Sequence, residues 1–286
     1  MQKIILFYKF YPLTEPQMTM RWQRELCLRL HLMGRVIIAD HGINGTLGGE
    51  PRELKTYIKS MNQTIEFKDT AYKWSNGSRE DFPRLSIKVR KELVTLAPSE
   101  TFDVFDRGTP LSPEAWHDYL KKHPDVTVLD VRNDFESDIG AFKSSIKPQI
   151  KVFKEIKNEI KKLSKNKPVL TYCTGDIRCE YLSAYMKHKG FENVYHLDGG
   201  IVSYGERYGD DGFWEGKCYV FDRRMNLAFS RHSMDIGKCS RCSAKTSDYQ
   251  NCANLSCNRL VLLCKDCFEQ RSTCSGVCQQ ALVSTA

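Results

Sequence analysis

The chain has 286 residues, of which 41% are hydrophobic, and its 43 Lys and Arg against 35 Asp and Glu leave a formal net charge of +8. This length and composition are those of a globular protein with two or three domains, and they exclude a disordered or fibrous chain. The N-terminal apolar run is short and interrupted by Lys9, and no run approaches membrane-spanning length, so we expect neither a signal peptide nor a membrane partner. We therefore expect a cytoplasmic protein whose 12 cysteines are thiols or metal ligands rather than disulfides. The positive charge is compatible with a polyanionic partner.

Residues 1–97 are predicted to form an α+β domain. Helical patterns cover residues 15–33, with an apolar stripe from Met18 to Leu30, and residues 51–61. Strand-like runs cover residues 4–8, 36–39, 43–47 and 83–96. The order strand, helix, strand, strand, helix, strand is that of a ferredoxin-like split βαβ domain.

The last predicted strand of this domain has two different faces. Apolar residues alternate with polar or basic ones along Leu85-Ser-Ile-Lys-Val-Arg-Lys91, so one face should be buried and the other basic. A basic sheet face binds the phosphates of a nucleic acid, or it is an ordinary solvated surface. Lys88, Arg90 and Lys91 are therefore candidate binding residues.

A glycine-rich stretch, residues 42–49, surrounds Asn44 and Thr46. Glycines at this density serve tight turns, or they let a ligand approach the backbone closely. Under the second alternative Asn44 and Thr46 would contact that ligand.

Residues 98–111 are predicted to be a linker, and residues 112–210 an α/β domain. Its run Val126-Thr-Val-Leu-Asp-Val131 is continuously apolar, as strands of parallel sheets are. Arg132 follows at the carboxyl end of this strand, where α/β sheets place their sites, and it is a candidate substrate-binding residue.

The strongest chemical signal is the segment Thr171–Glu180. A short apolar strand ends at Cys173, and a helical pattern begins near Arg178. Unpaired N–H groups and the helix dipole favour an anion at such a place, which should lower the pKa of the Cys173 thiol and make it a nucleophile. Arg178 would hydrogen-bond the anion that the thiol carries. The alternative is a buried structural cysteine at a strand end.

Three segments, Val128–Arg132, Cys173–Arg178 and His196–Ile201, resemble the signature motifs of a rhodanese domain. In the related cell-cycle phosphatases of this fold the loop is one residue longer, to fit phosphate. The six-residue loop of this chain suits a single sulfur atom, which favours sulfur or thiol chemistry over dephosphorylation.

A narrower resemblance covers most of the chain. Residues 42–49, 88–95, 131–134, the Cys173 segment and residues 214–222 stand in the order and spacing of the rhodanese-like tRNA uridine hydroxylases (TrhO-type). The resemblance implies oxygen-dependent formation of 5-hydroxyuridine at the wobble position of tRNA. It implies tRNA as the partner, molecular oxygen as co-substrate, Cys173 as the essential thiol and Arg178 as part of its loop. No obligate protein partner is evident.

The chain departs from this family at one position of the loop. The family loop reads Cys-Thr-Gly-Gly-Ile-Arg-Cys-Glu, whereas this chain carries Asp176 at the second Gly position. A carboxylate that points inward would raise the pKa of Cys173, and one turned to solvent would matter little. We expect the helix and Arg178 to outweigh Asp176, since they act directly on the sulfur and the Asp176 side chain can rotate away. Asp also tolerates a left-handed backbone better than most residues, so the backbone of the loop should survive the change.

A lysine-rich segment, residues 143–167, also differs from the expected pattern. It holds nine Lys and two Glu, a net charge of 9 − 2 = +7. Phe153, Ile156, Ile160 and Leu163 make an apolar stripe at helical spacing, with lysines on another face. That face is either an RNA-facing patch or a solvated helix surface.

Residues 211–286 form a cysteine-rich module. Thiolate pairs two to four residues apart are how a tetrahedral zinc is bound, and eight of them suit two sites of structural Zn²⁺. Sequential pairing and a cross-braced arrangement of the first and third pairs are both open, and a reduced or partly disulfide-bonded knuckle is the alternative to zinc. The candidate ligands are Cys239, Cys242, Cys252, Cys257, Cys264, Cys267, Cys274 and Cys278.

The preferred interpretation is an α/β enzyme in three parts that hydroxylates tRNA through Cys173. One rival is a sulfurtransferase that carries a persulfide on Cys173. Another is a non-catalytic RNA-binding protein whose loop is disabled by Asp176. No flavin, haem or iron-binding motif stands out in the sequence, so it does not indicate how oxygen is activated.

Overall fold

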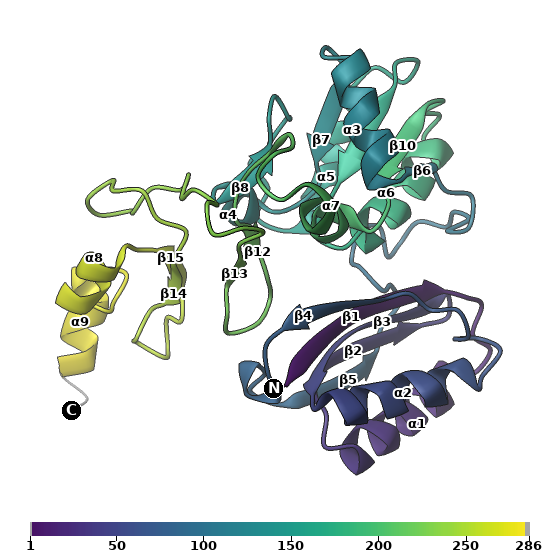
Figure 1. Ribbon diagram of the computed structural model, residues 1–286, viewed down its shortest axis with the longest axis horizontal. Helices are drawn as coiled ribbons and strands as arrows, with labels where there is room; N and C mark the ends of the chain where they lie inside the picture. Colours follow the sequence, from purple (N-terminus) through teal and green to yellow (C-terminus); the bar gives the residue numbers. More distant parts are fainter. Residues whose placement is uncertain (1, 284–286) are drawn as a thin grey trace.

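The computed structural model describes residues 2–283, whose elements fall into an N-terminal part, an α/β part and a C-terminal part (Figure 1). The N-terminal part is a five-stranded sheet in the order β4-β1-β3-β2-β5, with two helices below it in Figure 1. The strands β4, β1, β3 and β2 pair antiparallel with one another, which is the ferredoxin-like arrangement. Its elements are β1 (Lys3–Phe10), α1 (Pro16–Arg29), β2 (Met33–Ala39), β3 (Gly42–Gly49), α2 (Pro51–Asn62), β4 (Tyr72–Asn76) and β5 (Leu85–Val89).

The predicted mixed fold is confirmed, but its last strand is not the one expected. The strand predicted over residues 83–96 is limited to β5, and it pairs in parallel with β2 at the edge of the sheet. The fourth ferredoxin-like strand is β4, which the sequence analysis missed. Residues 72–75 are only partly buried and Asn76 is exposed, so this edge strand lacks the strong apolar alternation that reveals buried strands.

The first helix ends earlier than predicted, at Arg29, because Met33 already begins β2. Met18, expected on the buried stripe, is 65% exposed. The helix buries Gln23, Leu26 and Cys27 instead, and Trp22 lies at the margin of this face.

The two faces of the N-terminal sheet differ as predicted for β5. One face is apolar and is covered by α1 and α2, with Ile87 buried in it. The other face is turned toward the α/β part (Figure 1). Residues paired across strands share a face, so the strand register brings two rows of side chains onto this second face. The first row is Lys73, Leu6, Thr46, Arg35 and Ser86. The second row, beside the first, is Tyr8, Asn44, Ile37 and Lys88.

The glycines of residues 42–49 serve packing within this domain. A Cβ atom at Gly45 would lie 2.4 Å from the Phe7 ring, and one at Gly48 would lie 2.6 Å from the carbonyl oxygen of Ser78. Gly42 has a φ of +142° at the turn between β2 and β3. The alternative of turns and close backbone packing therefore accounts for these three glycines.

The α/β part has a parallel sheet in the order β6-β10-β9-β7. Residues of α3 and α7 pack in one core cluster with Leu170, and residues of α5 and α6 pack in another with Val169, so helices cover both faces. Its first strand comes from the segment predicted to be a linker. The elements are β6 (Thr109–Leu111), α3 (Pro113–Lys122), β7 (Thr127–Asp130), α4 (Asp134–Ser137), β8 (Gly140–Phe142), α5 (Ile156–Ile160), β9 (Val169–Tyr172), α6 (Ile177–His188), β10 (Val194–Leu197) and α7 (Gly200–Tyr208).

Arg132 follows β7 as predicted, but it lies in the core. Its side chain has no exposed surface, and its Nη2 lies 2.6 Å from the Asp130 carboxylate and donates to the carbonyl of Gly140 at 2.6 Å. Its guanidinium also lies over the rings of Tyr172 and Trp214. Arg132 therefore does not lie where a substrate could reach it, as its predicted substrate-binding role requires; it compensates the charge of the buried Asp130 carboxylate.

The lysine-rich segment forms only a 3₁₀ turn and the short helix α5. Phe153, Ile156 and Ile160 are buried as the stripe predicts. The lysines do not share one face: Lys151 pairs with Asp134 and Lys157 with Glu100.

The end of the C-terminal part, from residue 249 on, lies to the left of the other two parts in Figure 1, and the hairpin of residues 218–227 lies below α4. The first strand of the C-terminal part pairs with β8 of the α/β part, and the short hairpin, β12–β13, follows. None of the helices in residues 2–283 is long and apolar enough to span a membrane. The elements are β11 (Trp214–Gly216), β12 (Cys218–Tyr219), β13 (Asn226–Leu227), β14 (Tyr249–Asn251), β15 (Leu260–Leu262), α8 (Lys265–Gln270) and α9 (Gly276–Val283).

Candidate active site and metal-binding clusters

A cleft of about 1100 Å³ lies between the open face of the N-terminal sheet and the Cys173 loop, residues 173–178. Asn44 and Thr46 of β3 and Lys88 of β5 line it, together with Cys173 and Arg178. The cleft therefore collects most of the candidate catalytic and substrate-binding residues, from segments up to 134 positions apart. Lys91 is exposed and Arg132 is buried, and neither lines the cleft.

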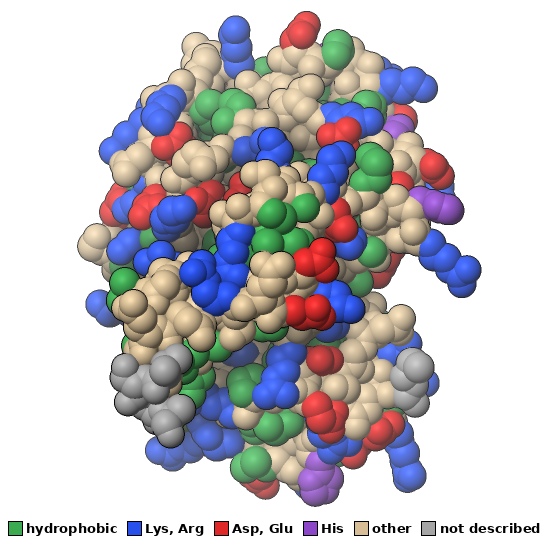
Figure 2. All heavy atoms as spheres, turned by 90° about the vertical axis from the view of Figure 1, so that its left-hand side faces the viewer, with side chains coloured by type: hydrophobic (Ala, Val, Ile, Leu, Met, Phe, Trp, Pro, Cys, Tyr) green, Lys and Arg blue, Asp and Glu red, His purple; other side chains and the backbone are tan. Residues whose placement is uncertain are grey.

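The lining of the cleft is strongly basic. Its two acidic residues are engaged by the protein itself: Glu92 accepts hydrogen bonds from two backbone N–H groups and from Tyr181, and Asp222 pairs with Arg224. On the face seen in Figure 2, by contrast, Lys and Arg side chains are interspersed with Asp and Glu. The basic residues of the cleft are Arg35, Lys73, Arg84, Lys88, Arg90, Lys154, Arg178 and Arg224.

Cys173 stands at the end of β9 and before α6, as predicted, and is 1% exposed. The backbone N–H of Asp176 donates to its Sγ at 3.2 Å. Burial disfavours the thiolate, but hydrogen bonds from Cys179 and the charge of Arg178 outweigh it and lower the pKa of Cys173 to about 6.

The carbonyl groups of the Cys173 loop are bound from outside the loop. The first N–H groups of α7 donate to the carbonyls of Cys173 and Thr174, at 2.9 and 3.1 Å. Gly200, with a φ of +67°, permits this approach, because a Cβ atom there would lie 2.6 Å from the Cys173 carbonyl oxygen. The Nζ of Lys73 donates to Gly175 at 2.9 Å. These contacts hold the backbone of the loop in the conformation in which the Asp176 N–H points at the sulfur.

Arg178 makes its hydrogen bonds elsewhere than predicted. Two of its nitrogens donate to the Glu136 carboxylate at 2.6 and 2.7 Å, and a third contact reaches the Thr174 hydroxyl. Burial would raise the pKa of Glu136, but the charge and hydrogen bonds of Arg178 lower it. Glu136 therefore holds Arg178 in place, and the guanidinium acts on Cys173 through its charge.

Asp176 does not rotate away from the loop, although the pKa of Cys173 is lowered as expected. Its side chain is fully buried, at a φ of +84°. Its carboxylate lies 2.8 Å from Nδ1 of His196 and accepts hydrogen bonds from the Tyr8 hydroxyl and the Gly199 N–H. Burial would lower the pKa of His196, but the hydrogen bond and charge of Asp176 raise it. Asp176 turns inward because these partners compensate its charge.

Lys73 and Tyr8, which were not predicted as site residues, bring the N-terminal sheet into contact with the Cys173 loop. Lys73 donates a second hydrogen bond to Gly199, at 2.6 Å. Tyr8 donates to Glu180 of α6 at 2.7 Å, and Glu180 also pairs with Arg107. Burial lowers the pKa of Lys73, while the Asp176 charge opposes that shift. No local motif marks either residue; for His196 the signal was the segment His196–Ile201.

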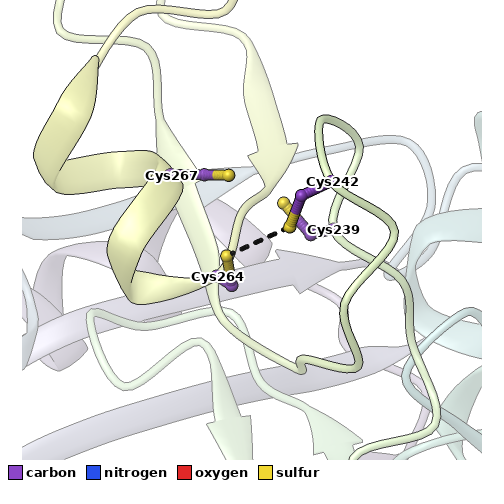
Figure 3. A group of neighbouring side chains, drawn as sticks. All are labelled: Cys239, Cys242, Cys264 and Cys267. Atoms are coloured by element: carbon purple, nitrogen blue, oxygen red, sulfur yellow. Dashed lines mark hydrogen bonds between the residues drawn. The ribbon is translucent and has the colours of Figure 1, made fainter.

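The eight candidate metal ligands gather in two groups of four. Cys239, Cys242, Cys264 and Cys267 point toward one another from the loop before β14 and from the start of α8 (Figure 3). The other group is Cys252, Cys257, Cys274 and Cys278, so the pairs are cross-braced rather than sequential.

The spacing of these sulfurs suits a metal ion. The ligand atoms of each group lie within 4.8 Å of one another, and the Cys242–Cys264 and Cys257–Cys274 sulfurs are 3.6 Å apart. Four thiolates around zinc, at Zn–S distances of about 2.3 Å, lie about 3.8 Å apart. All 12 cysteines lie in the described part of the chain, and none is in a disulfide. Both groups could bind a metal ion.

Comparison with known families divides the chain in the same way. Residues 2–93 match the UPF0176 acylphosphatase like domain, residues 112–207 the Rhodanese-like domain and residues 215–280 the family described as Rhodanase C-terminal. The second match covers the Cys173 loop and three strands of the parallel sheet, β7, β9 and β10.

Relatives align over nearly the whole chain. A protein of Arthrobacter sp. is 46% identical and one of Corynebacterium urealyticum 44% identical, each over 96% of both chains. A protein of Corynebacterium diphtheriae is 42% identical over 99% of this chain and 98% of its own. All three are named tRNA uridine(34) hydroxylase. With a rhodanese-like domain in its middle and this identity along its length, the chain belongs to the tRNA uridine(34) hydroxylase family.

Proposed function

We propose that this protein hydroxylates uridine 34, the wobble uridine, of tRNA and that Cys173 is the reactive thiol. The proposed activity rests on one observation: the chain is 42–46% identical, along nearly its full length, to proteins named tRNA uridine(34) hydroxylase. The product is 5-hydroxyuridine, and molecular oxygen is the source of the added atom. Both follow from the family resemblance.

The chemistry proposed for Cys173 is nucleophilic. With a pKa of about 6 the thiol is mostly ionised at neutral pH, and a thiolate is a strong nucleophile. Addition of Sγ to C6 of the uracil ring would make C5 nucleophilic toward the oxidant, and loss of the C5 proton with release of the thiolate from C6 would then restore the ring double bond and regenerate Cys173. One atom of O2 would enter at C5, and the other would leave as water with two electrons from a reductant outside this chain. Arg178, held by Glu136, keeps a positive charge beside the sulfur.

The basic cleft is the proposed site for the tRNA backbone. Lys88 and Arg90 are exposed on one wall, and Cys173 lies in the opposite one. A groove lined by eight basic residues, whose two acidic residues are bound by the protein itself, attracts the phosphates of a nucleotide chain. Asn44 and Thr46, on the same sheet wall as Lys88, are proposed to contact the nucleoside.

The two cysteine groups are proposed to hold one structural Zn²⁺ each. Four thiolates are a closed zinc set with no open position for substrate, so this metal stabilises the fold and takes no part in the reaction. The cytoplasm is the proposed location, because it keeps such thiols reduced.

The activity is tested by nucleoside mass spectrometry of tRNA from cells that lack this gene and regain it. Wild-type protein should restore 5-hydroxyuridine and Cys173→Ser should not, because serine supplies no thiolate. Cys27→Ser, a change at a buried thiol remote from the cleft, is the control and should restore it. Loss of 2-thiouridine instead of 5-hydroxyuridine would favour the sulfurtransferase.

The ionisation of Cys173 is measured by its alkylation rate against pH, followed on the Cys173 peptide by mass spectrometry. Below the pKa the thiol is protonated and slow, so the rate should rise with a midpoint near pH 6, not near 8.5 as for a free thiol. Asp176→Asn removes a charge that opposes ionisation and should move the midpoint lower. A wild-type midpoint at 8.5 would make the non-catalytic rival the better account.

The basic wall is tested by the salt dependence of tRNA binding. Replacing Lys88 and Arg90 by Ala should weaken binding and reduce the slope of log K against log salt by about 1.4, at about 0.7 for each contact with a single strand. Replacing Lys121 and Lys122, exposed on α3 outside the cleft, removes the same charge and should leave the slope unchanged. Equal slopes for both double variants would contradict the proposed contacts.

Elemental analysis of protein purified without chelator tests the metal. Two zinc ions per chain are expected, and about one after Cys264→Ser or after Cys257→Ser, because each variant loses a ligand of one group only. A metal-free protein with a folded C-terminal part would rule zinc out.

A further inference from the structure

Phe221 is an aromatic side chain left half exposed in the wall of the cleft. It is 50% exposed and lines the same cleft as Cys173 and Arg178. The Arg178 guanidinium lies 5.8 Å from the centre of its ring. An aromatic ring exposed among cations is the arrangement by which proteins bind single-stranded nucleic acids, with a base stacked on the ring and the cations at the phosphates.

The Phe221 ring is held in place by one ring from its own hairpin and one from α4. Tyr219 of β12 packs at 80° to it with ring centres 5.1 Å apart, and Phe135 packs at 82° with centres 6.3 Å apart. Such perpendicular packing of aromatic rings is favourable and restricts the orientation of the ring. Little conformational entropy is therefore lost when a ligand covers it.

The loop that carries Phe221 is tied to the N-terminal sheet across the cleft. Arg224, paired with Asp222, donates to the Ser75 hydroxyl at 3.0 Å, and the Arg223 N–H donates to the Asp81 carbonyl at 3.2 Å. The position of Phe221 relative to both walls is thus fixed by contacts on either side.

We propose that Phe221 is the stacking platform for the uracil ring that reacts at Cys173. This inference rests on the proposed function and adds how the base is held. Aromatic side chains bind unpaired RNA bases by stacking, and the basic residues around Phe221 supply the contacts to the flanking phosphates. An apolar peptide would also cover the ring, but it would leave the cations of the cleft unpaired.

The test compares binding of two anticodon stem-loop RNAs, one with uridine at position 34 and one abasic there. Phe221→Leu keeps an apolar side chain and removes the aromatic plane. It should weaken binding of the uridine RNA about tenfold, since stacking contributes about 1–3 kcal/mol per base. It should not change binding of the abasic RNA, which has no base to stack. Phe221→Tyr should bind both RNAs as the wild type does.

The matched control is Phe105→Leu, a change at a phenylalanine that is 42% exposed outside the cleft, and it should bind both RNAs normally. Equal binding of the uridine RNA by wild type and Phe221→Leu would overturn the proposal. So would an equal loss with both RNAs, which would mean that Phe221 contacts another part of the loop. The binding assay does not depend on turnover. Absence of 5-hydroxyuridine in the nucleoside assay would therefore overturn the proposed function, whereas the stacking role of Phe221 is decided by the binding of the two RNAs alone.

Discussion

The contact on which the active site depends is the one between Lys73 of the N-terminal sheet and the carbonyls of Gly175 and Gly199. An ammonium group in this largely enclosed position is tolerable because two carbonyl oxygens accept from it and Asp176 lies close by. Through this contact the sheet is held against the Cys173 loop, and the space between them becomes the cleft. The rhodanese-like domain supplies the thiol, but the opposite wall of its site belongs to another domain.

Asp176 shows how this contact changes the meaning of a sequence difference. Beside a thiolate an isolated carboxylate that points inward raises the pKa of the sulfur. In the structure His196, Tyr8 and the nearby Lys73 compensate its charge, and the pKa of Cys173 is still lowered to about 6. The departure from the family loop is therefore absorbed by residues outside the loop.

What could be predicted from the sequence is what neighbouring residues determine. The Cys173 loop was predicted correctly, since a strand, a tight turn and a helix start follow one another within ten residues. Its contact with Lys73 spans 102 positions and no local pattern reports it. Arg132 was misjudged for the same reason: a position after a strand does not reveal whether the side chain turns to the site or, as here, to Asp130. For the cysteine pairs, spacing marked the eight candidate ligands, but their grouping in space depended on the path of the chain between them.

The two cysteine groups lie outside the cleft and are connected to its wall by packed side chains. Cross-bracing fixes the loop before β14 to the start of α8, and β14 then presents Tyr249, whose ring packs on Tyr219 and whose hydroxyl donates to the Phe135 carbonyl at 2.9 Å. Tyr219 and Phe135 are the two rings that hold Phe221. The C-terminal part has few large apolar residues of its own, so bound metal would supply the stability that its small core lacks. A structural metal with no place in the reaction would in this way determine how firmly one wall of the cleft is held.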